Sequence, residues 1–194
     1  MSTLRITGGA LRGRRIPVPP RDVRPTSERA RQAFFNIVAP RIGGARFLDL
    51  FAGTGIFSFE ALSRGAASSV AVDSSGQQLA AIERQALAWQ LPLRTLRAEL
   101  PAGMKRMGDA LFDLVYADPP YGFTSYDALL LAIDGGVKLS PGALVAIEHR
   151  RREEPFTTAP ERLHFVRRAE YGEVWISMFA TKDRGPQTTD DSPE

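Results

Sequence analysis

The chain of 194 residues contains no cysteine and only two histidines, His149 and His164. A disulfide scaffold and a cysteine-ligated metal site are therefore excluded, and we expect no metal site. No apolar run approaches the roughly 18 residues that a transmembrane helix needs, and the first residues lack an apolar signal segment. With 43% hydrophobic and 24% charged residues, the composition predicts a cytoplasmic globular protein that does not enter a membrane.

Negative charge is scarce near the amino terminus. Residues 1–46 contain ten arginines but only two acidic residues, Asp22 and Glu28, which gives this segment a net charge of +8. Since the whole chain has a net charge of +3, the remainder carries −5. A basic segment on a mildly acidic body favours a polyanionic partner, because arginines pair with phosphates and release counterions. A basic surface that is only solvated explains the charge equally well.

The order of the expected elements predicts an α/β fold in three parts. Residues 1–45 read as a basic extension of hairpin and helix, 46–180 as one domain in which strands alternate with helices, and 181–194 as a disordered tail. Such alternation predicts a mainly parallel sheet covered on both faces. The expected strands are Leu4–Thr7, Arg14–Val18, Phe47–Leu50, Ser69–Asp73, Leu93–Arg97, Phe112–Ala117, Leu144–Glu148, Arg162–Ala169 and Glu173–Ala180. The expected helices run from a Thr26 or Ser27 cap to Val38, Ile56–Arg64, Ser75–Gln90 and Tyr126–Gly135.

A glycine-rich turn follows the first strand of the domain, in the segment Asp49–Gly55. Glycines at such a turn let the backbone approach a ligand closely. Ser58 stands where a dinucleotide fingerprint has its third glycine. Asp49 would repel a pyrophosphate but suits a ligand that carries an ammonium and a sulfonium, which disfavours a nicotinamide-dependent oxidoreductase. Asp73 ends the next strand, where a carboxylate can accept hydrogen bonds from both hydroxyls of a ribose, although a structural turn with a capping Asp73 is the alternative.

The tetrapeptide Asp118-Pro119-Pro120-Tyr121 follows another apolar strand and is expected at the carboxyl edge of the sheet. An aromatic amino group is a poor nucleophile, because its lone pair is delocalised into the ring. The Asp118 carboxylate and a backbone carbonyl fixed by the prolines can accept its two N–H bonds and draw the nitrogen toward tetrahedral geometry. Tyr121 can stack on a base that has left its own stack. The tetrapeptide therefore indicates methylation of a base amino group, with a capped proline turn as the alternative.

Three segments, Phe47–Gly55, Val70–Asp73 and Asp118–Tyr121, resemble in this order the motifs of class I amino-methyltransferases. The amino-terminal arm resembles the RsmD family more narrowly, and the similarity runs from about Leu4 to Phe179. The segments of the arm that carry it are Arg5–Gly9, Arg12-Gly13-Arg14, Arg24-Pro25-Thr26 and Arg29–Ile37.

The resemblance implies a Rossmann-like class I methyltransferase fold, with a mainly parallel seven-stranded sheet, an antiparallel carboxyl-terminal hairpin and a small amino-terminal β-hairpin. It implies S-adenosylmethionine as the cofactor, and N2 of one guanine of 16S rRNA in the assembled 30S subunit as the target, and we expect a monomer. The catalytic residues implied are Asp118, Pro119, Pro120 and Tyr121. The cofactor-binding residues implied are Arg24, Thr26, Asp49, Phe51, Gly53, Thr54, Gly55, Asp73, Glu99 and Leu100. The RNA-binding residues expected in the arm are Arg5, Arg12, Arg14 and Arg15.

Some alternatives stay open. A DNA or other RNA methyltransferase acting on adenine N6 or cytosine N4 would share the motifs, and so would a non-catalytic RNA-binding assembly factor. His149 follows a core strand near the site and reads as a hydrogen-bonded strand end rather than a catalytic base. Arg150, followed by two more arginines and two glutamates, fits either an RNA contact or a solvated loop. Phe123 and Tyr126 are candidates for the wall of a base pocket.

Overall fold

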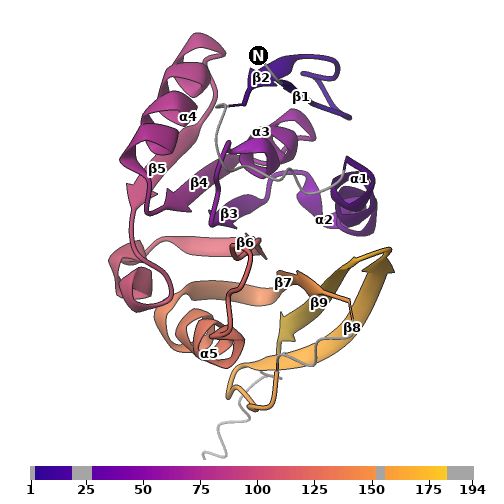
Figure 1. Ribbon diagram of the computed structural model, residues 1–194, viewed down its shortest axis with the longest axis vertical. Coiled ribbons are helices and arrows are strands. Elements are labelled where there is room, and N and C mark those ends of the chain that lie inside the picture. The colour runs from indigo at the N-terminus through magenta and orange to yellow at the C-terminus, as the bar shows by residue number, and fades with distance from the viewer. Residues whose placement is uncertain (1–2, 19–27, 152–155, 183–194) are drawn as a thin grey trace, which may run out of the picture.

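The computed structural model describes residues 3–18, 28–151 and 156–182. Its centre is a seven-stranded sheet with the order β5-β4-β3-β6-β7-β9-β8 (Figure 1). The first five strands in this order are parallel, whereas β9 is antiparallel to both β7 and β8. The strands are β3 (Arg46–Leu50), β4 (Ser68–Asp73), β5 (Leu93–Arg97), β6 (Leu111–Ala117), β7 (Lys138–Arg150), β8 (Leu163–Tyr171) and β9 (Val174–Thr181). The Rossmann-like class I fold, with its antiparallel hairpin at the end, is confirmed.

Helices cover both faces of the sheet, and each face has its own apolar core. One core joins the sheet to α1 (Glu28–Ile37), α2 (Ala39–Ile42), α3 (Ile56–Ser63) and α4 (Gly76–Ala88). The other joins it to the short 3-10 helix η1 (Ala102–Met107) and to α5 (Tyr126–Gly136). The central strands β3 and β6 are largely buried and consist mainly of apolar residues, as expected for parallel strands covered on both faces. Within the described ranges, no helix has the length and apolar character needed to cross a membrane.

The amino-terminal hairpin packs directly on the domain. Its strands β1 (Thr3–Arg5) and β2 (Arg15–Pro17) are antiparallel, and Ile6 and Ile16 are buried in the same core as α3. At Gly9, where φ is +77°, an added Cβ would lie 1.8 Å from the Ser63 carbonyl oxygen. Only glycine therefore lets the hairpin approach the end of α3 this closely.

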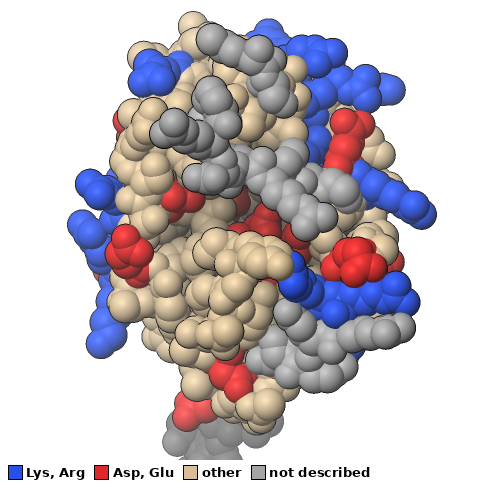
Figure 2. Space-filling view, in the orientation of Figure 1, with Lys and Arg blue, Asp and Glu red and all other residues tan. Residues whose placement is uncertain are grey.

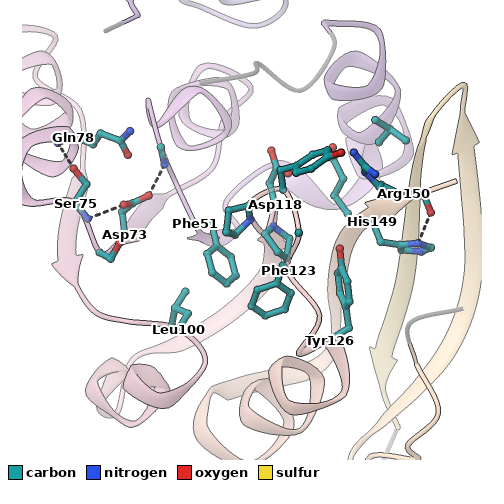
Figure 3. A pocket seen from close by; sticks show the side chains of 18 of the residues that line it. Phe51, Asp73, Ser75, Gln78, Leu100, Asp118, Phe123, Tyr126, His149 and Arg150 are labelled. Carbon is teal, nitrogen blue, oxygen red and sulfur yellow. Dashed lines mark hydrogen bonds between the residues drawn. The ribbon is translucent and has the colours of Figure 1, made fainter. Parts of the chain in front are cut away.

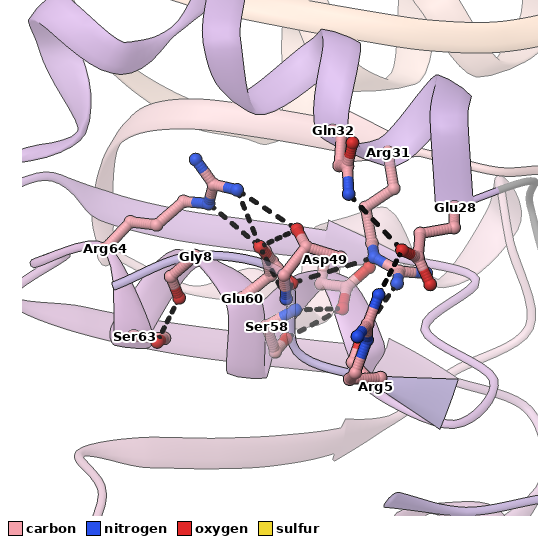
Figure 4. A network of polar contacts seen from close by, with 11 residues as sticks. Arg5, Gly8, Glu28, Arg31, Gln32, Asp49, Ser58, Glu60, Ser63 and Arg64 are labelled. Carbon is pink, nitrogen blue, oxygen red and sulfur yellow. Dashed lines mark hydrogen bonds and ion pairs between the residues drawn. The ribbon is translucent and has the colours of Figure 1, made fainter. Parts of the chain in front are cut away.

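A buried carboxylate on α3 ties this hairpin and α1 to the domain (Figure 4). Glu60 is fully buried, accepts the backbone N–H of Thr7 at 2.9 Å, and lies 2.8 Å from the Arg64 guanidinium. Arg31 on α1 is 1% exposed, with its Nε 3.7 Å from Glu60, and it donates to the Arg5 carbonyl at 2.9 Å. Burial lowers the pKa of Arg31, and the charge of Glu60 opposes that shift. Each charge is thus held in the interior by the other.

The structure differs from the sequence expectations in three places. The helices α2 and η1 were not expected, because four and six residues are too short for an apolar period to show. Strand β7 begins at Lys138, whereas Leu144 was expected. The pairing changes from Phe112 with Leu139 to Leu114 with Leu144, so the Pro141-Gly142 segment loops out of a strand that continues beyond it. The expected cap at Thr26 or Ser27 and the tail beyond Lys182 lie outside the described residues.

We predict that Glu60→Gln lowers the free energy of unfolding by about 3–5 kcal/mol, because it leaves the buried Arg31 without its counter-charge. Urea denaturation measures the change. Asp109→Asn is the matched control: Asp109 pairs with Lys138 at 2.6 Å, but both side chains are more than half exposed. An exposed pair contributes at most about 1 kcal/mol. Equally small losses of unfolding free energy in the two variants would contradict the predicted contribution of Glu60 to stability.

Candidate functional site

A cavity of about 960 Å³ lies at the carboxyl ends of β3, β4, β6 and β7. Figure 2 shows acidic side chains within a hollow near the middle of this face and basic side chains around its margins. Predicted site residues that line the cavity are Phe51, Gly53, Asp73, Glu99, Leu100, Asp118, Pro119, Pro120 and Tyr121. The parallel strands therefore bring together segments that are distant in the sequence, as ligand sites of open α/β sheets require.

The turn after β3 has an unusual backbone. Phe51 has φ of 60°, a left-handed conformation that costs a residue with a side chain, and Gly53 and Gly55 have φ of 53° and 74°. At Gly55, an added Cβ would lie 2.9 Å from Ile82, so this glycine lets α3 start against α4. The Phe51 side chain lines the cavity and meets the Phe123 ring edge-on, with ring centroids 5.5 Å apart. The unfavourable backbone conformation of Phe51 thus places its side chain in the cavity wall.

Asp73 fixes two loops at once (Figure 3). Its carboxylate oxygens accept the backbone N–H groups of Gly53 at 2.9 Å and Ser75 at 2.8 Å. Ser75 in turn caps α4 by accepting the N–H of Gln78 at 3.3 Å. A carboxylate has about four lone-pair sites, so two amide bonds leave capacity for a ligand. Asp73 therefore holds the two loops together by hydrogen bonds and also offers an acceptor within the cavity.

Asp49 does not line the cavity, and neither do Thr54 or Gly55. Asp49 is 2% exposed and lies behind the turn, where it accepts both the N–H and the hydroxyl of Ser58, at 3.0 and 2.7 Å. Burial raises the pKa of Asp49 to about 7, although the two bonds from Ser58 oppose this. Ser58, which stands in place of the third glycine, thus anchors this carboxylate behind the turn.

The part of the cavity near Leu100 has both apolar and polar residues. Leu100 and Phe51 supply apolar wall, and the exposed Glu99 stands at its edge. Arg24 and Thr26, which were expected to close over the cofactor, lie outside the described residues.

The tetrapeptide Asp118–Tyr121 forms the rim of the cavity at the end of β6. Asp118 donates its backbone N–H to the Leu50 carbonyl, N···O 3.3 Å, which holds this rim beside the glycine turn. Tyr121 is 79% exposed, and the Arg150 guanidinium lies 3.8 Å from the centroid of its ring. A cation over one ring face holds the ring in place by cation–π attraction.

Strand β7 contributes Glu148, which the sequence did not single out as a ligand contact. Glu148 lines the cavity and accepts the Tyr116 hydroxyl at 2.6 Å. His149 is 3% exposed and bonded to the Ser177 hydroxyl at 2.8 Å, which makes it a hydrogen-bonded strand end as expected. Arg150, Phe123 and Tyr126 also line the cavity. The register that pairs Ala117 with Ile147 places Glu148 beside the end of β6, and no local sequence signal indicates this register.

The arginines of the arm lie away from this cavity, on the hairpin. Arg5, Arg12, Arg14 and Arg15 are all exposed. Arg15 donates to the Thr3 hydroxyl at 3.0 Å, and the Arg14 guanidinium lies 5.2 Å from the Trp89 ring centroid. Their charges are therefore held near the hairpin but remain open to solvent.

The sequence model of a family described as "Conserved hypothetical protein 95", the RsmD family, matches residues 4–180. The chain belongs to this family. It is 30% identical over 189 residues to the "Putative rRNA methyltransferase YlbH" of Bacillus subtilis, covering 94% of this chain and all of the relative. It is also 30% identical to the "Ribosomal RNA small subunit methyltransferase D" of Escherichia coli K12, over 96% of this chain and 94% of that one.

Solved structures agree with membership of the RsmD family. "Putative methyltransferase yhhF from Escherichia coli" superposes with a TM-score of 0.80 at 27% identity, over 93% of this chain and 99% of that one. The chain is accordingly a methyltransferase of the RsmD family, and S-adenosylmethionine is its cofactor. The cavity fits this cofactor chemically: it offers the Asp73 carboxylate, the apolar Phe51 and Leu100, and acidic side chains that suit a positively charged ligand.

We predict that Asp49 makes the stability of the ligand-free protein depend on pH. Its raised pKa means that the folded state keeps a proton that the unfolded state has lost above about pH 4. Stability due to this proton is lost as the pH rises through about 7. Asp49→Asn should therefore gain stability relative to the parent between roughly pH 5.5 and 8.5, by more than about 1.4 kcal/mol, the value of one pKa unit.

The matched control is Asp113→Asn. Hydrogen bonds from Arg46 hold the pKa of Asp113 well below its ordinary value. The carboxylate therefore stabilises the fold equally at both pH values, and its loss should cost the same at each. Urea denaturation at the two pH values measures both variants. A constant difference between Asp49→Asn and the parent would contradict the prediction.

Proposed function

We propose that the protein methylates the exocyclic N2 of one guanine of 16S rRNA, in the assembled 30S subunit. The observation that carries the proposal is the Asp118–Tyr121 rim, which places a carboxylate and an exposed aromatic ring beside the cofactor cavity. The names of the small-subunit relatives and the resemblance of the arm to the RsmD family support the choice of substrate. We further propose that the protein acts as a monomer in the cytoplasm.

The cofactor would lie along the turn after β3. The Asp73 carboxylate is the proposed acceptor for the ribose hydroxyls, and Phe51 and Leu100 the walls beside the adenine. Glu99 stands at the edge as a further polar contact. We assign Thr54, Gly55 and Asp49 to shaping the turn. Arg24 and Thr26 are the proposed contacts of the cofactor's methionine end. When bound, S-adenosylmethionine supplies a methyl group on a positively charged sulfur, which keeps the C–S electron pair as the methyl leaves.

Asp118 is the proposed catalytic acceptor. Its carboxylate and the Pro119 carbonyl would accept the two N–H bonds of the guanine amino group and turn the nitrogen lone pair out of conjugation. The lone pair then forms the N–C bond to the methyl carbon, and N2 afterwards releases one proton to water. No strong base is needed, because the methylated nitrogen is positively charged until that proton leaves. Asp118 acts by orientation, which can contribute several kcal/mol to the barrier.

Tyr121 is the proposed stacking partner of the target base. One face of its ring lies under the Arg150 guanidinium, while the side chain is 79% exposed. The base would stack on the other face after leaving its own stack, a contact that contributes about 1–3 kcal/mol. Arg150 thereby places a positive charge at the mouth of the cavity, where the phosphates of the displaced nucleotide must pass.

Transfer of labelled methyl groups tests this proposal. The enzyme is given 30S subunits that lack the modification, naked 16S rRNA and DNA in parallel, and the modified nucleoside is identified. We expect N2-methylguanosine from the subunits. Methyladenine or methylcytosine would keep the chemistry and replace the substrate, and no transfer to any of them would favour an assembly factor without catalysis.

In the same assay, Asp118→Ala should lower turnover at least about 100-fold while the Kd for the cofactor stays within about twofold. Turnover equal to that of the parent would remove Asp118 from the mechanism.

The exposed arginines of the hairpin are the proposed phosphate contacts. Replacing Arg12, Arg14 and Arg15 with alanine should weaken subunit binding and reduce the slope of log K against log salt by up to about three, one for each lost phosphate contact. Binding at several salt concentrations measures the slope. An equal loss of charge at Arg84, Arg94 and Lys105, which are exposed on α4, β5 and η1, is the control and should leave the slope nearly unchanged. Equal slopes in both triple variants would assign the RNA surface elsewhere.

A further inference from the structure

Glu148 stands beside the proposed catalytic carboxylate without a part in the chemistry described so far. Strands β6 and β7 are parallel, and Ala117 pairs with Ile147. The next residue on each strand is Asp118 and Glu148, and both line the cavity. Figure 3 shows Asp118, which follows β6, near Arg150 of β7. A base whose amino group reaches Asp118 must therefore present its neighbouring edge toward β7.

The Glu148 side chain is held by a buried phenol. Tyr116 is fully buried and donates its hydroxyl to Glu148 Oε2 at 2.6 Å. Its ring stacks on Phe57 at 3.9 Å between centroids and lies 4.6 Å from that of Phe34 on α1. Burial, followed by the charge of Glu148, raises the pKa of Tyr116 well above its ordinary value, so the proton remains on the phenol. A group packed on two aromatic rings thus orients the carboxylate.

Hydrogen-bond chemistry decides which base such a carboxylate accepts. Guanine carries N1–H next to its N2 amino group, so its edge offers two adjacent kinds of donor. Adenine and cytosine instead carry a ring-nitrogen lone pair next to their amino group. A carboxylate only accepts, and it has capacity beyond the Tyr116 bond. It would attract guanine N1–H and repel a lone pair in the same place, which is both positive and negative selection.

We propose that Glu148 determines the specificity for guanine by accepting its N1–H while Asp118 accepts from N2, and that Tyr116 positions Glu148 for this role. This inference rests on the proposed guanine-N2 activity. It assigns selection of the base to β7 and methyl transfer to β6. The arm participates indirectly, because Phe34 of α1 packs against the ring of Tyr116.

The test compares guanine with 2-aminopurine at the target position of reconstituted 30S subunits. 2-Aminopurine keeps the amino group at the same place but has a lone pair at N1. The parent enzyme should prefer guanine in kcat/KM. Glu148→Gln removes the carboxylate that accepts N1–H, so kcat/KM for guanine should fall about 10- to 100-fold. Because the new amide can also donate to the N1 lone pair of 2-aminopurine, the preference for guanine should shrink at least about 10-fold. Any intrinsic difference between the two bases cancels in the ratio of ratios.

Two further variants complete the design. Tyr116→Phe keeps the ring but removes the hydroxyl, and should reduce the preference in the same direction by a smaller factor. Glu170→Gln, an exposed change on β8 outside the cavity, is the charge-matched control and should retain the parent preference. The cofactor Kd and the melting temperature of each variant show whether it is folded. If Glu148→Gln is not folded, the ratio in Tyr116→Phe decides.

An unchanged ratio in the folded Glu148→Gln enzyme would overturn the inference. An equal loss of kcat/KM on both bases leaves this ratio unchanged, and it would mean that the carboxylate acts on something that the two bases share. Failure of the proposed function is seen separately, since it would appear as absence of N2-methylguanosine with the parent enzyme itself.

Discussion

The parallel pairing of β4, β3, β6 and β7 is the constraint on which the site depends. It brings four carboxyl ends to one edge, so that the glycine turn, Asp73, Asp118 and Glu148 line one cavity, although Glu148 stands 95 positions after Gly53 in the sequence. The apolar cores on both faces keep these strands in register. A slip of one residue would exchange the faces of every side chain on a strand, and would turn Asp118 or Glu148 away from the cavity.

Carboxylates near this edge have different tasks because their surroundings differ. Asp49 is buried with two bonds from Ser58, and its pKa rises to about 7. Asp73 accepts two backbone amides and joins two loops. Glu148 accepts the hydroxyl of the buried Tyr116. The residue type alone therefore indicates little about the role, which follows from the donors that surround each group.

The sequence predicted the sheet, the alternation of its strands with the four longer helices, and the edge at which the cavity lies, because glycine turns and strand ends have local signatures. It did not predict that Asp49 turns inward, since the direction of a side chain at a strand end depends on packing. Glu148 and the Arg150–Tyr121 contact went unpredicted for a related reason: they arise from register between β6 and β7, which no local pattern encodes. Strand β7 was underestimated because Pro141 and Gly142 normally end a strand.

The buried Glu60 also bears on how this protein could have been assembled in evolution. An RNA-binding extension is often a detachable module joined by a linker, gained or lost without effect on the catalytic domain. Here the hairpin and α1 supply Thr7 and Arg31 to a carboxylate on the first helix of the domain. Deleting the extension would expose apolar surface and remove the donors of an interior charge. We therefore expect the hairpin, α1 and the sheet to unfold together, and a shortened chain without the hairpin and α1 to require changes in α3 as well.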